Sequence, residues 1–509
     1  MKKLLFPFAG IGALLLMPQA ALASEETPPA PASVGVEGPL VTGEGPQDLR
    51  SAASDGAGGA YVAYVQSRDG TNGDVFIQRI GGPAPWSAPI RISDGTLNHH
   101  SPRVHRTHDG GAVVVWLSAG SITRVHVQRF RPSGERVLAA PGAGGQVRMV
   151  DGTADSGNGV FVLERRLAPM GDDIVLTRYT EAGVVAFNTA PLGKVVEGAS
   201  GAAGQPRLCR TPSGEAIVAL PLTQLKVLKF SATGAPLWGT DGVSVTSVFG
   251  HKGDVSIACD AKGGVVLGWT DARRGPGLRD AFGQVLDATG RALWPANGIA
   301  LAQDTGGVEV ATDGAQGGYF AYTIASGRGI ARQMASMRVA RDGSVAYGAG
   351  ATSIAEGADY NSRIPVFASD GKGGAFLSWK SEPTTASVAA RPCLGMRWLG
   401  PTGTSAWGTE PVRAGRCTAY PPGHAWVVGN GTVTLLWNDA RAGYSDIYGF
   451  TAPAPGALLA PVPPGPAAPP ASTASTGTPT LSPKAKQALT PNARVPLPKT
   501  LTLPGKDKP

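Results

Sequence analysis

Five arginines at repeat-related positions are the residues of this chain best suited to binding chemistry. They are Arg103, Arg106, Arg207, Arg210 and Arg363. A guanidinium group is permanently charged, and its fork of N–H donors matches a carboxylate or a phosphate. Because each arginine belongs to a strand-like segment that recurs along the chain, we expect the five to line one mouth of a central channel. The alternative is a structural role, in which they pair with acidic side chains of neighbouring repeats.

Two other clusters carry atoms that ligate metals. Five of the seven histidines fall between His99 and His126, and imidazoles at this density could hold zinc or copper. They have no helical i, i+4 spacing, so we interpret them as solvated loop histidines. The loop Asp69–Asp74 offers oxygen ligands, but it departs from the calcium-loop pattern and is interpreted as a turn. We therefore expect no metal and no cofactor.

Short catalytic motifs are absent from the sequence. It lacks the Gly-x-Ser-x-Gly elbow, the His-Glu-x-x-His helix motif and the phosphate-binding loop. Charged hairpin residues recur instead, since Asp271-Ala-Arg273 is repeated as Asp439-Ala-Arg441. A catalytic site needs one unique constellation, so repetition favours ion pairs across hairpins. No catalytic residue is assigned, although the paired carboxylates of a glycoside hydrolase can lie far apart in sequence.

Four cysteines indicate an oxidising compartment. We predict one disulfide between Cys393 and Cys417, which lie on either side of a turn in the same repeat. We predict a second between Cys209 and Cys259, which lie on opposite faces of corresponding strands in neighbouring repeats and can therefore point toward each other. Neither pair has the Cys-x-x-Cys spacing, so both are interpreted as structural.

The elements that must position these residues belong to a repeat. Seven times, at intervals of 49 to 60 residues, a glycine is followed four residues later by a large apolar residue. The pairs are Gly82/Trp86, Gly134/Leu138, Gly183/Phe187, Gly234/Trp238, Gly290/Trp294, Gly343/Tyr347 and Gly403/Trp407. A repeat of this length in strand-like sequence is typical of solenoids and of toroidal folds.

Eight copies of a second motif, a Gly-Gly pair followed by an apolar run, precede these turns. Each unit reads as four strands: an inner strand, a fully apolar strand, an alternating strand and an outer strand often opened by proline. The eighth unit stops near Phe450 without its outer strand, and Pro39–Thr42 at the other end of the chain matches one. We therefore predict an all-β, eight-bladed β-propeller over residues 34–452, closed by the N-terminal strand.

The remaining segments carry export and charge features. Residues 1–23 have the charged, apolar and small-residue order of a secretory signal peptide. Residues 24–33 read as a linker, and residues 453–509 as a disordered, basic tail rich in proline and alanine. The tail (+5) and the leader (+2) account for all but about one of the eight net positive charges. Nucleic-acid binding by the folded body is therefore not expected.

Localisation follows from the same features. No apolar run after the leader is long enough to span a bilayer, so we expect no transmembrane segment. The basic tail could make weak contact with anionic envelope surfaces. We expect an exported monomer in the periplasm or outside the cell.

Two of the turns carry a family resemblance. Leu286–Trp294 (Leu-Asp-Ala-Thr-Gly-Arg-Ala-Leu-Trp) and Phe230–Trp238 resemble the tryptophan-docking turn of pyrroloquinoline-quinone-type propellers, over about nine residues per blade. The resemblance implies an aromatic girdle packed between neighbouring blades. Its members would be Trp86, Trp238, Trp294 and Trp407. The family's haem motif and adjacent-cysteine pair are missing, and the rest of the repeat resembles uncharacterised exported bacterial propellers.

Repetition without a unique polar constellation favours an exported, non-enzymatic module. It would bind a protein or a glycan, or act as a scaffold, through loops at one face of the ring. The alternative is a glycan-active hydrolase or lyase with its site at the channel mouth. A quinone-dependent redox enzyme is the third hypothesis.

Overall fold

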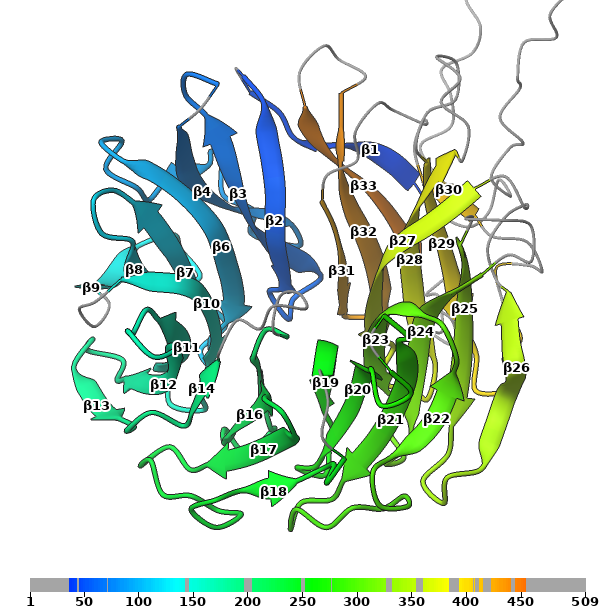
Figure 1. Cartoon of the computed structure of the whole chain (residues 1–509). Helices are drawn as coiled ribbons and strands as arrows, with labels where there is room; N and C mark the ends of the chain where they lie inside the picture. The colour runs from blue at the N-terminus through cyan, green and yellow to red at the C-terminus, as the bar shows by residue number, and fades with distance from the viewer. Residues whose placement is uncertain are drawn as a thin grey trace, which may run out of the picture. The chain divides into compact units, whose positions relative to one another are not determined.

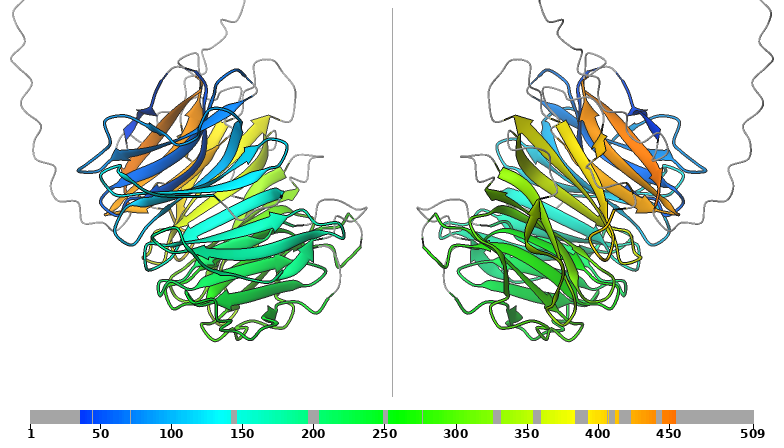
Figure 2. Two further views of the ribbon diagram at one scale, coloured as in Figure 1. Left: turned by 90° about the vertical axis from the view of Figure 1, so that its left-hand side faces the viewer. Right: turned by 90° about the vertical axis from the view of Figure 1, so that its right-hand side faces the viewer.

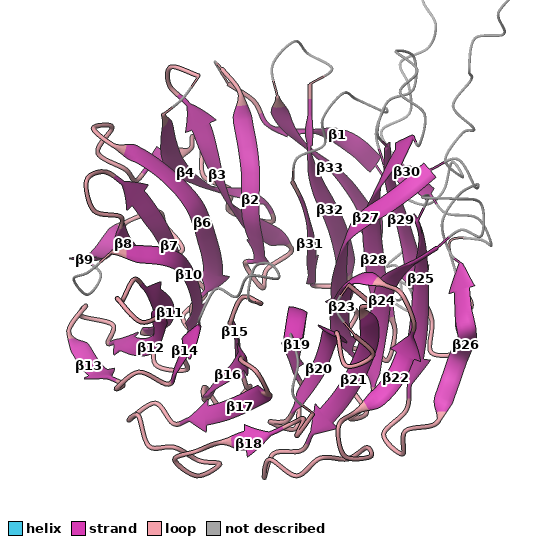
Figure 3. Cartoon of the chain, viewed as in Figure 1, coloured by secondary structure: helices cyan, strands magenta, loops and turns pink. Residues whose placement is uncertain are grey.

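The computed structural model describes the greater part of the chain between residues 36 and 454. The described ranges are 36–43, 45–70, 72–141, 146–195, 204–248, 252–275, 277–325, 332–353, 360–383, 393–405, 407, 412–414, 423–440 and 445–454. Within them the structure consists of β-strands and their connecting turns (Figure 3). The predicted signal peptide, the linker and all but the first two residues of the tail lie outside these ranges. Across these ranges no helix is long and apolar enough to cross a membrane.

The strands form eight antiparallel sheets arranged about a central axis, which confirms the predicted eight-bladed propeller (Figure 1). We number the sheets as blades 1 to 8 by the order of their innermost strands. The innermost strands are β2 (Gln47–Ser54), β6 (Asn98–Arg106), β10 (Val147–Ala154), β15 (Arg207–Arg210), β19 (Lys252–Cys259), β23 (Gly306–Thr312), β27 (Tyr360–Ser369) and β31 (His424–Gly429). Each contacts the innermost strand of the next blade, and β31 contacts β2, so the ring is complete.

The second and third strands of each blade form its core. The second strands are β3 (Gly59–Ser67), β7 (Ala112–Ala119), β11 (Val160–Arg166), β16 (Ala216–Pro221), β20 (Val265–Asp271), β24 (Gly318–Ala325), β28 (Ala375–Pro383) and β32 (Thr432–Asp439). The third strands are β4 (Gly73–Gly81), β8 (Arg124–Phe130), β12 (Asp172–Tyr179), β17 (Leu225–Phe230), β21 (Asp280–Leu286), β25 (Arg332–Val339), β29 (Cys393–Leu399) and β33 (Asp446–Pro453). Strands such as β20 and β21 are buried along their whole length, because neighbouring blades cover both faces (Figure 2).

The outer strands are short and irregular, as expected for edge strands. They are β5 (Ile90–Arg91), β9 (Arg136–Pro141), β13 (Val185–Asn188), β18 (Val243–Ser244), β22 (Ile299–Ala302), β26 (Val345–Ser353), β30 (Val412–Ala414) and β1 (Val36–Val41). In blade 3 a further strand, β14 (Gly193–Val195), also pairs with β12. Because successive strands run in opposite directions, the turn after the first strand of each blade lies on the same face as the turn that joins the third strand to the outer strand in blades 1 to 7. We call this face the turn face.

Blade 8 is assembled from both ends of the described chain. β1 pairs antiparallel with β33, and Pro39 lies opposite Tyr448, as predicted. The junction of blade 8 with blade 1, which we call the seam, is fastened by a fully buried asparagine. Asn438 accepts a hydrogen bond from the Leu49 amide at 2.9 Å and donates to the Gln47 carbonyl at 2.6 Å. The N-terminal strand therefore completes the last sheet.

Aromatic side chains of the turns after the third strands pack against the next blade. The indole Nε1 of Trp86 donates to Pro132 O at 2.9 Å, that of Trp238 to Ala288 O at 3.0 Å, and that of Trp294 to Ala340 O at 3.1 Å. Each acceptor belongs to the corresponding turn of the following blade. Trp407 instead packs against Trp426 and Phe450 of blade 8.

The glycines of these turns explain the seven-fold sequence repeat. Gly290 has φ +86°, a conformation that favours glycine. A Cβ atom built on Gly290 would also lie 3.0 Å from the Trp238 ring of the preceding blade. The same contact joins Gly234 to Phe187 and Gly343 to Trp294. Glycine is therefore favoured at this position for two reasons. It adopts the positive φ angle, and its lack of a side chain lets the aromatic ring of the preceding blade pack directly against the backbone.

Candidate ligand-binding site

Most innermost strands end in a turn built on an aspartate. Asp55 Oδ1 accepts hydrogen bonds from the amides of Ala57 and Gly59 at 2.7 and 2.8 Å. Its other oxygen pairs with Arg79 of β4 at 2.7 Å. Equivalent carboxylates are Asp155, Asp260, Asp313 and Asp370. Arg178 and Arg338 neutralise the first and third of these four in the same way, so these acids are structural.

The five predicted arginines occupy different levels of the channel wall. Arg106 and Arg210 are the last residues of β6 and β15, next to the turn face. Arg103 and Arg207 lie three residues earlier, deeper in the ring. Arg363 lies opposite Lys380 toward the other end of its strand, and its side chain is outside the described part of the structure. The structure therefore places two of the five at one mouth.

Arg103 and Arg207 belong to a ring of charged and polar residues inside the channel wall. The corresponding positions of the following blades carry Asp151, Ser256 and Glu309. Arg103 Nη1 donates to Arg50 O at 3.2 Å, and Arg207 Nε donates to Val255 O at 2.9 Å.

These contacts bear on the alternative that the arginines are structural. Burial raises the pKa of Glu309, while a hydrogen bond from Ser256 and the nearby Arg207 oppose that rise. Arg103 and Arg207 thus have backbone carbonyl or acidic groups of neighbouring blades beside them. This arrangement favours a structural role between blades for these two arginines over ligand binding.

Arg106, Arg210 and Lys262 form what we call the basic rim of the turn face. The Arg106 guanidinium lies over Gly56, in the turn of the preceding blade. Arg210 Nη1 donates to Asp155 O, likewise in the turn of the blade before it, at 3.4 Å. Burial lowers the pKa of Arg210, the negative charge of Asp155 opposes this fall, and the positive charge of Arg106 adds to it. Two guanidinium groups close enough to repel each other favour an anion between them.

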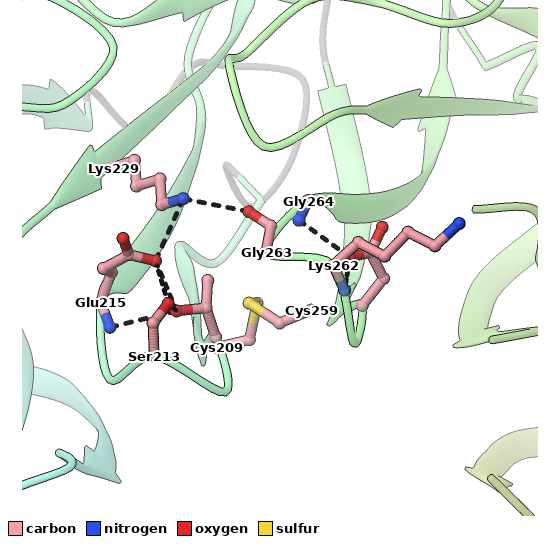
Figure 4. Close-up of a disulfide and its surroundings, with 10 residues drawn as sticks. Cys209, Ser213, Glu215, Lys229, Cys259, Lys262, Gly263 and Gly264 are labelled. Atoms are coloured by element: carbon pink, nitrogen blue, oxygen red, sulfur yellow. Dashed lines mark hydrogen bonds and ion pairs between the residues drawn. A yellow bond between two sulfur atoms is a disulfide. The ribbon is translucent and has the colours of Figure 1, made fainter. Parts of the chain in front are cut away.

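A disulfide fixes the rim between blades 4 and 5. Cys209 and Cys259 are joined, as predicted, with their Cα atoms 5.8 Å apart (Figure 4). Each cysteine lies next to a turn or strand end that carries a rim residue. In the same view Lys262 extends away from the Lys229–Glu215 ion pair. Cys393 is also disulfide-bonded, whereas Cys417, its predicted partner, is outside the described residues.

Several buried polar atoms on or beside the innermost strands have no hydrogen-bond partner among the described residues. They are Asp48 Oδ1, His105 Nε2, Gln205 Oε1 and His424 Nε2. A buried polar atom without a partner costs roughly 1–3 kcal/mol. Such atoms are normally satisfied by ordered water or by a bound molecule. We therefore expect ordered water at these positions.

The two channel histidines predict acid sensitivity. Burial lowers the pKa of both His105 and His424 to about 4. The unfolded chain, with a histidine pKa near 6.5, therefore binds a proton first as the pH falls. Stability is fully present above about pH 6.5 and decreases toward pH 4, by at most about 1.4 kcal/mol per pH unit for each histidine.

Urea unfolding at neutral pH and near pH 4.5 measures this effect. The double variant His105→Gln, His424→Gln should reduce the difference between the two pH values. The matched control is His108→Gln, which changes an exposed turn histidine and should leave the difference unchanged. An unaltered difference in the double variant would show that the acid sensitivity arises elsewhere.

His99, His100 and His126 lie in strands and correct the expectation of solvated loops, whereas His108 lies in an exposed turn. His99 is buried within β6, and its Nε2 lies 2.9 Å from Asp94 Oδ1. Trp116 Nε1 donates to His99 Nδ1 at 3.2 Å, and His126 stacks on Trp116 with ring centroids 5.1 Å apart. A bulge between His100 and Arg103 sets which side chains of β6 face the sheet. No group of three or more metal ligands occurs among the described residues.

A buried ion pair in blade 5 is a polar feature that sequence reasoning missed. Lys252 and Asp271 are both fully buried, with Nζ and Oδ2 3.3 Å apart. Arg273 pairs with the same Asp271 at 2.6 Å, and Arg274 pairs with Asp280. The recurring Asp-x-Arg hairpin motif marked part of this network. Lys252 belongs to a different segment, so only the fold brings it to the pair.

Two sizeable cavities open near blade edges. One of about 560 Å³ lies between the turns of blades 5 and 6 and is lined by Arg291, Arg338, Arg341 and other residues of those turns. The other, of about 680 Å³, lies in blade 3 beside Arg148 and Leu167. Both volumes fall in the range of small-molecule pockets. The first adds further arginines to the turn face that carries the basic rim.

No family model matches the sequence, and no curated protein matches it. Solved structures with similar folds include a protein of unknown function from Dyadobacter fermentans, at 11% identity and TM-score 0.40, which covers 82% of this chain and 99% of that one. A BP39L lectin from Burkholderia pseudomallei has 11% identity and TM-score 0.43, covering 72% and 99%.

A third similar structure is prolyl oligopeptidase B from Galerina marginata. It has 10% identity and TM-score 0.39, covering 68% of this chain and 48% of that one. The match spans about half the length of the peptidase.

Proposed function

We propose that this protein is an exported, non-enzymatic binding module that holds a carboxylate-bearing glycan or protein segment at the basic rim. Export rests on the leader-like residues 1–23 and on the disulfide chemistry. The observation that carries the ligand class is the repeated arginine: Arg106 and Arg210 cover corresponding turns in blades 1 and 3 and form no ion pair among the described residues.

The acids beside the rim support this proposal, because they are already occupied. Asp55 and Asp155 are held by their own turn amides and by Arg79 and Arg178. They cannot turn to neutralise the rim without leaving those amides unsatisfied. The positive charge of the rim therefore remains available to a ligand, and a guanidinium–carboxylate hydrogen bond is stronger than one between neutral groups.

A binding screen with acidic and neutral glycans, together with a polyglutamate peptide, tests the proposal. The mature protein should bind acidic members in a salt-dependent manner. The double variant Arg106→Glu, Arg210→Glu should weaken binding by at least tenfold, because each charged hydrogen bond contributes about 1.5–3 kcal/mol. Arg124→Glu is the matched control, since it reverses an exposed arginine at the opposite end of blade 2. Equal loss in the control would attribute binding to net charge alone.

The same screen separates the alternative of a glycan-active enzyme. Glu309 is a channel carboxylate with a raised pKa, which is a property of catalytic acids. Cleavage of an acidic polysaccharide that disappears in Glu309→Gln, while binding persists, would replace the binding-module proposal with a hydrolase or lyase. Binding without cleavage would support the module.

A further inference from the structure

The girdle of aromatic rings is interrupted at the seam. At five of the blade–blade junctions, a Cβ atom built on the glycine of the turn after the third strand would meet an aromatic side chain of the preceding blade. The ring and glycine pairs are Trp86/Gly134, Phe187/Gly234, Trp238/Gly290, Trp294/Gly343 and Tyr347/Gly403. Blade 8 takes β1 as its outer strand, and the sequence that follows β33, residues 454–509, contains no aromatic residue.

A cavity lies at the place where the missing ring would pack. It has a volume of about 230 Å³ and is lined by both blades of the seam. Blade 1 contributes Gly58, Gly59, Ala60, Ile80, Gly81 and Gly82, and blade 8 contributes Leu40, Val427, Gly429, Thr432, Thr434 and Thr451. This is smaller than the roughly 300–1,000 Å³ typical of small-molecule pockets. Its size suits a single ring rather than an extended ligand.

Four of the six blade 1 residues that line this cavity are glycines. Gly81 and Gly82 follow each other with φ +61° and +66°, a conformation that favours glycine at both positions. A Cβ built on Gly82 would meet Gly59 and Asp55 of its own blade, and no aromatic ring of blade 8. At the five junctions named above, a ring lies over the corresponding glycine. Here it remains open.

The blade 8 wall adds a polar pair. Thr434 and Thr451 lie opposite each other on β32 and β33, with their hydroxyl oxygens 3.0 Å apart. The corresponding pair in blade 5, Val266 and Val285, is apolar and fully buried. A hydroxyl pair at the wall can accept a hydrogen bond from an indole N–H, the role that backbone carbonyls play for Trp86, Trp238 and Trp294.

We propose that the seam cavity binds an aromatic side chain, preferentially tryptophan, supplied by another polypeptide. The incoming ring would supply at the seam what this chain supplies at five other junctions. The occupant is assigned from the repeat itself, because five corresponding junctions select a ring at this place. This inference is independent of the basic rim and of any anionic ligand.

A short peptide with one central tryptophan and glycine neighbours is the probe. The mature protein should bind it saturably, with a Kd on the order of 1 mM or tighter, and the same peptide with alanine should not bind. Thr434→Phe fills the cavity and should reduce binding at least tenfold. Thr233→Phe, which adds the same ring to an exposed turn of blade 4, is the matched control and should bind like the parent.

Thr451→Trp is a second filling variant, at an exposed cavity residue that tolerates size. If Thr434→Phe does not fold, Thr451→Trp still tests whether filling the cavity reduces peptide binding. Failure of the tryptophan peptide to bind, or equal binding by both filling variants and the parent, overturns the proposal. Displacement of the peptide by a neutral sugar at lower concentration would identify a sugar ring as the occupant and would also overturn it.

Discussion

Trp294→Ala should destabilise the protein by about 3–5 kcal/mol, the range for removing a large aromatic from a core. Trp294 is only 4% exposed, and its ring packs on Phe320 with centroids 5.9 Å apart. The substitution also removes the Nε1 hydrogen bonds to Ala340 O and Arg341 O, at 3.1 and 3.2 Å. The ring fills the junction of blades 5 and 6, so its loss opens a cavity there. Urea unfolding followed by intrinsic fluorescence and circular dichroism measures the change.

Two controls separate the girdle role from a general loss of apolar surface. Trp294→Phe keeps most of the ring and loses the N–H, so it should cost about 1–2 kcal/mol. Leu237→Ala removes a turn side chain that is 45% exposed, and it should stay within about 0.5 kcal/mol of the parent. A Trp294→Ala loss no greater than that of Leu237→Ala would contradict a structural girdle.

Removing the N-terminal strand should have the second large effect. A chain that starts at residue 43 lacks β1, which carries the buried Val41 and half-buried Leu40. Burial of two such side chains contributes about 1.5–3 kcal/mol each, and the β1–β33 hydrogen bonds are lost as well. We expect a loss of at least about 4 kcal/mol. Removal also exposes the edge of β33, so association between chains should increase.

The matched control is a chain that starts at residue 34 and keeps β1. It should unfold at the same urea concentration as the mature protein. A synthetic peptide spanning residues 34–43 should restore part of the stability of the shorter chain when added at high concentration. Equal unfolding midpoints for the two truncated chains would mean that the seam does not depend on β1.

Repetition made the fold predictable. Eight copies of the Gly-Gly motif against seven copies of the later turn implied eight blades with one outer strand missing, and β1 supplies that strand. The Cys209–Cys259 bridge followed from strand alternation in the same repeat. These predictions needed only features that recur, because recurrence turns many weak local signals into a strong one.

The candidate binding site was less predictable. It depends on how far along its strand each arginine lies and on which groups its side chain contacts. Arg103 and Arg106 are three residues apart, which is roughly 10 Å along a strand, so one lies in the wall and the other at the mouth. The partners of Arg207 and Arg210 are backbone carbonyls of other blades, which side-chain patterns do not identify. His99 was placed in a loop because β6 begins at Asn98, before the strand-like segment Pro102–Arg106, and a bulge separates the two parts of the strand.

Closure by the two ends of the chain has a kinetic consequence. Gln47 O accepts a hydrogen bond from Ser445 Oγ, and these residues are 398 positions apart in the sequence. The ring cannot be sealed until the final repeat has been synthesised. Until then β1 has no β33 with which to pair. Because such distant pairing carries a high entropic barrier, we expect sealing to be the last and slowest step of folding, with an open arc of blades as its precursor. If the chain is exported as proposed, that arc is the species that chaperones or proteases would meet first.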